Sequence, residues 1–188
     1  MIKIKWKTDY ENGYSLLELM AVVLLIAIMV TIAMPFLSAQ MASRKIDFIA
    51  RRLIADAQFA RAQALFLASP VRIAPHPTNH WGDGWVVQSE CAFSKNSPTC
   101  TERNWISQAS IAPIYFKGGG KQFVDPHSAR RGITFNAAGA AKSAQGGFVA
   151  NRLILGHERD PQLERQLILG SGGRWRICDP SRDAKACR

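Results

Sequence analysis

The longest apolar run in the chain lies near its N-terminus. Residues 19–37 contain no charged side chain. At 1.5 Å per helical residue this run would span about 28 Å, close to the hydrocarbon thickness of a bilayer. A secretory signal peptide would have a shorter apolar core followed by a cleavage site of small residues, and no such site follows Leu37. The run therefore predicts a membrane-spanning helix.

Beyond Leu37 the pattern becomes amphipathic. Apolar residues recur at steps of three and four, with arginines and Asp56 between them. Ser69-Pro70 is expected to end the helix, which would then hold about 50 residues. Its second half needs a sheet on its apolar side. The apolar positions are Ile46, Ile49, Leu53, Ala57, Ala60, Ala64 and Leu67.

Helical periodicity does not return after Pro70, and short strand-like segments separated by Gly, Pro and Asn follow. The expected fold class is α+β, with an antiparallel β-sandwich or sheet packed on the second half of the helix. Gly170–Gly173 predicts a hairpin connection, and residues 90–105 and 117–131 are expected to be irregular and exposed. The expected strands are Val71–Ala74, Trp85–Ser89, Ser110–Phe116, Gly132–Phe135, Phe148–Leu155, Gln166–Leu169 and Arg174–Cys178.

The formal net charge is +10, of which residues 1–13 contribute +1 and the remainder +9. A charge this large on a small domain favours a polyanionic partner, either nucleic acid or an acidic lipid surface. The alternative, which needs no partner, is a basic proteome or simple solubility.

The four cysteines form two pairs, Cys91 with Cys100 and Cys178 with Cys187. Zinc sites usually place two ligands about two to four residues apart, and neither pair is that close. Disulfides fit better if the domain lies in an oxidising compartment. Three connectivities are possible, and we favour the two local loops, each worth about 2–3 kcal/mol.

Candidate catalytic groups are lacking in this sequence. The four histidines are scattered, no Gly-x-Ser-x-Gly motif is present, and Gly118–Gly120 lacks the spacing of a phosphate-binding loop. We therefore expect no enzyme activity, no metal and no cofactor.

The C-terminal tail from Gly170 carries a net charge of +3. On a strand, Arg174 and Arg176 would point to one face and Trp175 to the other. Parallel guanidinium groups suit a phosphate backbone. A solvated basic strand end with Trp175 in the core is the alternative, and the pattern alone does not decide. A Cys178–Cys187 disulfide would hold three further cations near this strand, namely Arg182, Lys185 and Arg188.

The junction Gly13-Tyr14-Ser15-Leu16-Leu17-Glu18-Leu19 resembles the prepilin cleavage and N-methylation motif. In that motif a short basic leader ends in Gly, an aromatic residue begins the mature chain, and a Glu is fifth. Pro35, at position 22 of such a mature chain, fits the helix-kinking proline of these pilins. The family more often begins with Phe or Met than with Tyr. The resemblance implies cleavage after Gly13 by a prepilin peptidase and methylation of Tyr14.

Glu18 has two interpretations. With Ser15 it forms the pattern of a capping box at a helix start. A carboxylate at the edge of a hydrocarbon run is also costly and usually has a partner. The pilin resemblance implies one, which is the N-terminal ammonium of a neighbouring subunit in the filament.

The segment Ile133–Gly139 and the closing Gly173-Arg174-Trp175-Arg176 look like the FimT/GspH group of minor pilins and pseudopilins. In FimT-type members the Gly-Arg-x-Arg element is implicated in binding DNA during natural transformation, which implies Arg174 and Arg176 as main contacts. Arg182, Lys185 and Arg188 are added on charge and proximity. A second basic patch would comprise Lys117, Lys121, Arg130 and Arg131.

The same resemblance implies the organisation and partners of the chain. The expected domains are a leader (1–13), a transmembrane or filament-core half-helix (14–37), an amphipathic half-helix (38–68) and a globular β domain (69–188). The implied partners are DNA, other pilins in a filament, prepilin peptidase and, before assembly, the inner membrane. The protein would span that membrane once, with its C-terminal domain periplasmic, and then enter the pilus outside the cell. The alternative is a GspH-type pseudopilin with a structural role in filament assembly or type II secretion and no DNA binding.

Overall fold

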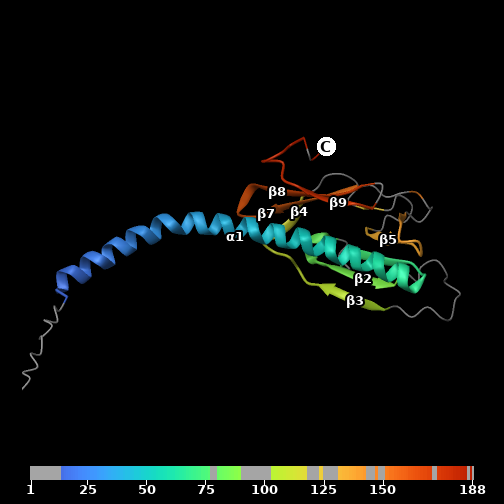
Figure 1. Cartoon of the computed structure of the whole chain (residues 1–188), viewed down its shortest axis with the longest axis horizontal. Coiled ribbons are helices and arrows are strands. Elements are labelled where there is room, and N and C mark those ends of the chain that lie inside the picture. The colour runs from blue at the N-terminus through green and yellow to red at the C-terminus, as the bar shows by residue number, and fades with distance from the viewer. Residues whose placement is uncertain are drawn as a thin grey trace, which may run out of the picture. The chain divides into compact units, whose positions relative to one another are not determined.

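The computed structural model describes residues 14–76, 80–89, 103–117, 123–124, 131–142, 147, 151–170, 173–185 and 187. The chain divides into two compact units, Met1–Gln40 and Met41–Arg188. Figure 1 traces the elements in chain order. They are α1 (Leu16–Leu67), β1 (Val71–Pro75), the 3-10 helix η1 (Trp81–Asp83), β2 (Trp85–Ser89), β3 (Asn104–Gln108), β4 (Ile114–Lys117), β5 (Ile133–Phe135), β6 (Ala141–Lys142), β7 (Asn151–His157), β8 (Asp160–Leu169) and β9 (Trp175–Cys178).

Within the first unit, the described residues form the start of α1. The helix begins directly after Ser15, whose Oγ accepts a hydrogen bond from the Glu18 N–H at 3.2 Å. All described residues up to Gln40 are exposed. By length and composition, α1 is long and apolar enough to cross a membrane. The predicted long N-terminal helix is therefore present, with 52 residues.

The second half of α1 buries one face. The buried positions follow steps of three and four, because side chains at these spacings share one side of a helix. Leu67 was expected in this set but is 41% exposed, and it is the last residue of α1. The Ser69 N–H donates to Ala64 O at 3.3 Å. The helix thus ends just before Ser69-Pro70. The buried apolar residues are Ile46, Ile49, Ala50, Leu53, Ala57, Ala60 and Ala64.

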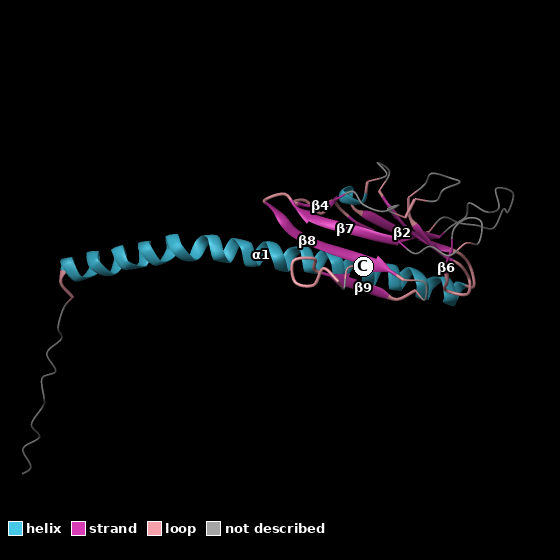
Figure 2. Ribbon diagram, turned by 90° about the horizontal axis from the view of Figure 1, so that it is seen from above, coloured by secondary structure: helices cyan, strands magenta, loops and turns pink. Residues whose placement is uncertain are grey.

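Two antiparallel sheets pack against this half of α1. A five-stranded sheet has the order β3-β2-β1-β5-β6, and a four-stranded sheet has the order β4-β7-β8-β9. Figure 2 shows β7, β8 and β9 running alongside the helix. Buried side chains of α1 and of both sheets form one core cluster, which includes Trp81, Trp85, Phe123 and Phe135. The α+β class with a helix packed on antiparallel sheets is confirmed.

Several predicted boundaries were wrong. The expected strand Ser110–Phe116 begins only at Ile114, because Ala112 and Pro113 form a turn. Residues 90–105 were expected to be irregular throughout, but β3 begins at Asn104 and pairs with β2. The short strand β6 was not predicted. Of the segment 117–131, the structure describes Lys117, Phe123, Val124 and Arg131. Lys117 ends β4, and Val124 and Arg131 form an isolated bridge.

The largest difference concerns β8, which is ten residues long although only Gln166–Leu169 was expected. Its first six residues, Asp-Pro-Gln-Leu-Glu-Arg, are mostly polar and show little apolar alternation. Pairing with β7 through a two-residue turn extends the strand regardless of that pattern. This extension places Arg165 inside the protein, where it is 6% exposed.

A buried carboxylate links α1 to the five-stranded sheet. Asp56 is 4% exposed, and its Oδ2 accepts a hydrogen bond from Trp85 Nε1 at 2.8 Å. Arg52 Nε lies 3.3 Å from the same oxygen. A buried charge is tolerated only when it is paired and hydrogen-bonded, and Asp56 has both kinds of partner. Every buried residue in the described part of the chain lies in the unit Met41–Arg188, which therefore contains the core.

Candidate nucleic-acid interface

The β8–β9 hairpin determines where Arg174 lies. The Gly170 N–H donates to Arg174 O at 2.9 Å, and the Gly173 N–H donates to Gly170 O at 3.0 Å. Gly173 has a φ of 73°, which favours glycine because it lies in the left-handed region. Leu169 pairs with Trp175, so β9 begins directly after Arg174.

Side chains alternate across β9. This strand is the last of the four-stranded sheet in the described part of the chain. Arg174 and Arg176 are exposed, whereas Trp175 and Ile177 are partly buried and pack against the core. Successive residues of a strand point to opposite faces, which explains the division. The two arginines therefore lie at the surface on one side of β9.

Trp175 has a packing role. Its ring lies 6.0 Å from that of Phe123 between centroids, at an interplanar angle of 49°. Tilted aromatic pairs at this separation are favourable beyond the area that they bury. The tryptophan thus fixes the side of β9 opposite the two arginines.

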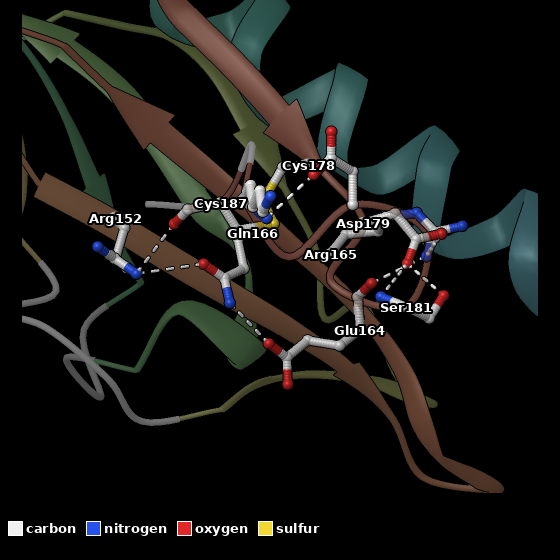
Figure 3. Close-up of a disulfide and its surroundings, with 10 residues drawn as sticks. Arg152, Glu164, Arg165, Gln166, Cys178, Asp179, Ser181 and Cys187 are labelled. Atoms are coloured by element: carbon white, nitrogen blue, oxygen red, sulfur yellow. Dashed lines mark hydrogen bonds and ion pairs between the residues drawn. A yellow bond between two sulfur atoms is a disulfide. The ribbon is translucent and has the colours of Figure 1, made fainter.

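A third arginine shares the outer face of this sheet. Arg152 on β7 is opposite Ile168 on β8, and Ile168 is opposite Arg176 on β9. Residues directly opposite each other share a face, and two strand spacings are about 10 Å. Figure 3 shows Arg152 Nη1 donating to Gln166 Oε1 at 3.3 Å and to Cys187 O at 3.4 Å. Arg152 therefore adds charge to this face and anchors the C-terminal loop, roles that sequence reasoning missed.

The C-terminal loop is closed by a disulfide between Cys178 and Cys187. This is one of the two local pairings favoured from the sequence, and its Cα–Cα distance is 5.5 Å. Arg182 and Lys185 lie within the loop, and both are exposed. Their charges differ in availability, because Arg182 Nε lies 3.6 Å from Asp179 Oδ2.

Asp179 organises the loop. Its Oδ1 accepts hydrogen bonds from the Ser181 hydroxyl at 2.6 Å and the Ser181 N–H at 3.0 Å. Burial raises the pKa of Asp179. The Ser181 hydrogen bonds and the charges of Arg165 and Arg182 outweigh that effect, so the net pKa is lowered from its ordinary value of 3.8. The carboxylate is therefore ionised at neutral pH.

Arg165 joins this loop to α1. Its Nη1 lies 2.9 Å from Asp179 Oδ2, and its Nε lies 2.7 Å from Asp47 Oδ1. Its Nη2 also donates to Ser43 Oγ at 3.3 Å. Sequence reasoning missed this residue because β8 was expected to begin one residue later. The signal was its position, two residues before Leu167 on the buried face of β8.

Two of the four residues of the predicted second basic patch, Lys117 and Arg131, lie in the described part of the chain. Lys117 belongs to β4 of the four-stranded sheet, and its Nζ lies 3.5 Å from Glu164 Oε2. Arg131 bridges Val124 and precedes β5 of the other sheet. Lys121 and Arg130 lie outside the described residues.

At the other end of the chain, Tyr14 is 79% exposed. Ser15 caps α1 as the sequence predicted, by accepting the Glu18 N–H. Among the described residues nothing hydrogen-bonds to the Glu18 carboxylate, so the reciprocal half of the capping box is not formed there. Four predicted site residues lie outside the described part of the chain, namely Gly13, Cys91, Cys100 and Arg188.

Two protein-family models match this chain. Residues 50–186 match the family described as type II transport protein GspH. The chain belongs to the GspH family. Residues 9–34 match the prokaryotic N-terminal methylation motif. This GspH-family chain is therefore a pilin-like subunit of the minor pilin or pseudopilin type.

Two solved structures are similar to this chain, and the first of them shows the same fold. The type IV minor pilin FimU of Pseudomonas aeruginosa is 19% identical with a TM-score of 0.51, covering 78% of this chain and 95% of its own. The minor pseudopilin EpsH of the Vibrio cholerae type 2 secretion system is 10% identical with a TM-score of 0.48, covering 72% and 98%. No curated protein sequence matches this GspH-family chain significantly.

Proposed function

We propose that the chain is a minor type IV pilin that binds DNA through β9 and the C-terminal loop and supports DNA uptake in natural transformation. One observation carries this proposal. Arg174, directly before β9, and Arg176, on β9, are both exposed, while Trp175 between them packs against the core. Two guanidinium groups thus extend from a backbone that is already ordered, so that little backbone entropy is lost on binding.

The chemistry favours phosphate recognition. A guanidinium presents paired donors that match two oxygens of a phosphate. The exposed Arg182 and Lys185 lie in the disulfide loop that follows β9, and Arg152 shares the outer face with Arg176. Binding of this kind is independent of sequence and sensitive to salt, because phosphate contacts release counterions.

The N-terminal region would serve assembly. We propose that prepilin peptidase cleaves after Gly13 and methylates Tyr14, as in proteins with this motif. The exposed Glu18 carboxylate would then meet the N-terminal ammonium of a neighbouring pilin. Residues 14–37 would anchor the subunit in the inner membrane, with the domain from 69 onward in the periplasm, until the subunit enters the filament.

The test is DNA binding by the full chain in a non-ionic detergent. Fluorescence anisotropy with a labelled duplex of about 30 base pairs, at about 0.1 M salt, measures affinity and its salt slope. The Arg174→Ala with Arg176→Ala variant should bind roughly tenfold or more weakly. The salt slope of its binding should become less steep, by the amount expected for nearly two lost phosphate contacts.

A matched control removes the same charge elsewhere. Arg44 and Arg51 are exposed on α1, and the Arg44→Ala with Arg51→Ala variant should bind within about twofold of the parent. An equal loss in both double variants would mean that net charge alone causes binding. No binding by the parent, even at low salt, would end the DNA proposal.

The GspH family match favours a second candidate, a structural pseudopilin that helps assemble a secretion filament. In that role the excess charge would need no DNA. Gene deletion separates the two candidates. Lost transformation with normal secretion supports the DNA-binding pilin, whereas lost secretion with normal transformation supports the structural pseudopilin.

A further inference from the structure

Arg61, near the end of α1, lies against the β8–β9 turn. An ideal Cβ built on Gly173 would be 2.9 Å from Nη1, 3.6 Å from Cζ and 4.0 Å from Nη2 of Arg61. The guanidinium therefore occupies the space that a side chain at position 173 would need. The positive φ at Gly173 favours glycine, whereas the close approach alone does not require it, because the end of the flexible Arg61 side chain can move.

This placement brings Arg61 of α1 close to the start of β9. Gly173 and Arg174 are neighbours in sequence, so their Cα atoms are about 3.8 Å apart. The Arg61 guanidinium thus lies beside the backbone of the residue that directly precedes Arg174. One DNA strand carries a phosphate per about 3.4 Å of axis, so the two groups would meet the same phosphate or adjacent ones.

Neither guanidinium is neutralised within the protein that the structure describes. The side chains of Arg61 and Arg174 form no hydrogen bond or ion pair with a described residue. Arg61 is only partly exposed, and a cation that has lost part of its water favours a compensating anion. By contrast, the buried Arg165 is already paired with Asp47 and Asp179.

We propose that Arg61 is a third phosphate-binding arginine, which completes a clamp between α1 and the β8–β9 hairpin. This inference rests on the proposed DNA binding. A side chain at position 173 would displace the Arg61 guanidinium from this place beside the hairpin. The bound group would be a backbone phosphate held from two elements of the fold.

The test compares Arg61→Gln with Arg51→Gln in the full chain in non-ionic detergent, with the same labelled duplex. Both variants remove one positive charge from α1, but Arg51 has no described contact with the hairpin. Arg61→Gln should weaken binding by roughly threefold to tenfold and lower the salt slope by about 0.9. Arg51→Gln should change affinity less than about twofold, and Arg61→Lys should retain the parent's slope.

A measurement without substitution covers the case in which Arg61→Gln fails to fold. Phenylglyoxal modifies exposed arginines, and mass spectrometry reports each site. The duplex should protect Arg61 together with Arg174, while Arg51 stays reactive. The clamp is wrong if Arg61 is neither protected by the duplex nor sensitive to substitution. In that case the DNA site still stands, provided that the parent binds and the Arg174→Ala with Arg176→Ala variant does not. A parent that does not bind overturns the function itself.

Discussion

Arg165 in β8 and Asp179 directly after β9 form an ion pair, with 2.9 Å between Nη1 and Oδ2. The same arginine pairs with Asp47 of α1 at 2.7 Å. One buried cation thus ties the C-terminal loop to the helix through two carboxylates. The ion pair with Arg165 and the Cys178–Cys187 disulfide, which Figure 3 shows, both fix the loop that carries Arg182 and Lys185.

Replacing Arg165 by Met should destabilise the protein by about 3 kcal/mol. The substitution removes the partner of two carboxylates, and breaking a buried pair from one side typically costs about 3–5 kcal/mol. Asp47 is partly exposed, which places the expectation at the lower end. Urea unfolding at neutral pH measures the loss. Arg182→Met is the control, because that side chain is 84% exposed and should change stability by less than about 0.5 kcal/mol. Equal effects of the two substitutions would contradict the structural role of Arg165.

Acid should remove the contribution of Asp179 to stability. The pKa of Asp179 in the folded state lies below the ordinary 3.8. As pH falls, Asp179 therefore takes up a proton in the unfolded chain before it does so in the folded protein. The stabilisation is complete well above pH 3.8 and is lost as pH falls through the folded pKa. Urea unfolding of the parent and Asp179→Asn at pH 7 and below pH 3.8 tests this. The stability difference between them should shrink in acid, and a constant difference would be inconsistent with the shift.

The α1 helix and the exposure of Arg174 and Arg176 were predictable because both are local. A helix follows from apolar steps of three and four, and a strand necessarily separates Trp175 from its two neighbours. The turn at Gly170–Gly173 was also predictable, since glycine clusters favour chain reversal. These features depend on residues within a few positions of one another.

The rest depends on contacts between distant parts of the chain. Arg165 is stable inside the protein because it pairs with Asp47, which is 118 positions away, and with Asp179. Arg61 looks like an ordinary charged position on an amphipathic helix until the hairpin places Gly173 against it. No periodicity in the sequence predicts either relationship. Arg152 was missed for the same reason, because its place beside Arg176 depends on the register of three strands.

Removing the Cys178–Cys187 disulfide should loosen the C-terminal loop without unfolding the core. The Cys178→Ser with Cys187→Ser variant should lose about 2–3 kcal/mol, the entropy expected for a loop of this size. Thermal unfolding measures the loss. DNA affinity should fall a few-fold, because Arg182 and Lys185 must then be ordered on binding. Unchanged affinity in a folded variant would exclude the loop from the interface. Substitution is preferable to a reductant, because it changes this pair of cysteines alone.

Trp175 should matter for stability and not for DNA contact. Its ring packs on Phe123 and is partly buried, on the side of β9 opposite the exposed arginines. Trp175→Phe keeps an aromatic ring in the core and should bind DNA within about twofold of the parent, whereas base stacking would give a loss of about 1–3 kcal/mol on truncation. Trp175→Ala should lower the free energy of unfolding by about 2–3 kcal/mol through lost packing. Anisotropy with both single-stranded and duplex DNA, alongside urea unfolding, separates the two roles. A Trp175→Phe variant of normal stability that bound single strands tenfold more weakly would assign the ring to the DNA, and the two faces of β9 would no longer have separate functions.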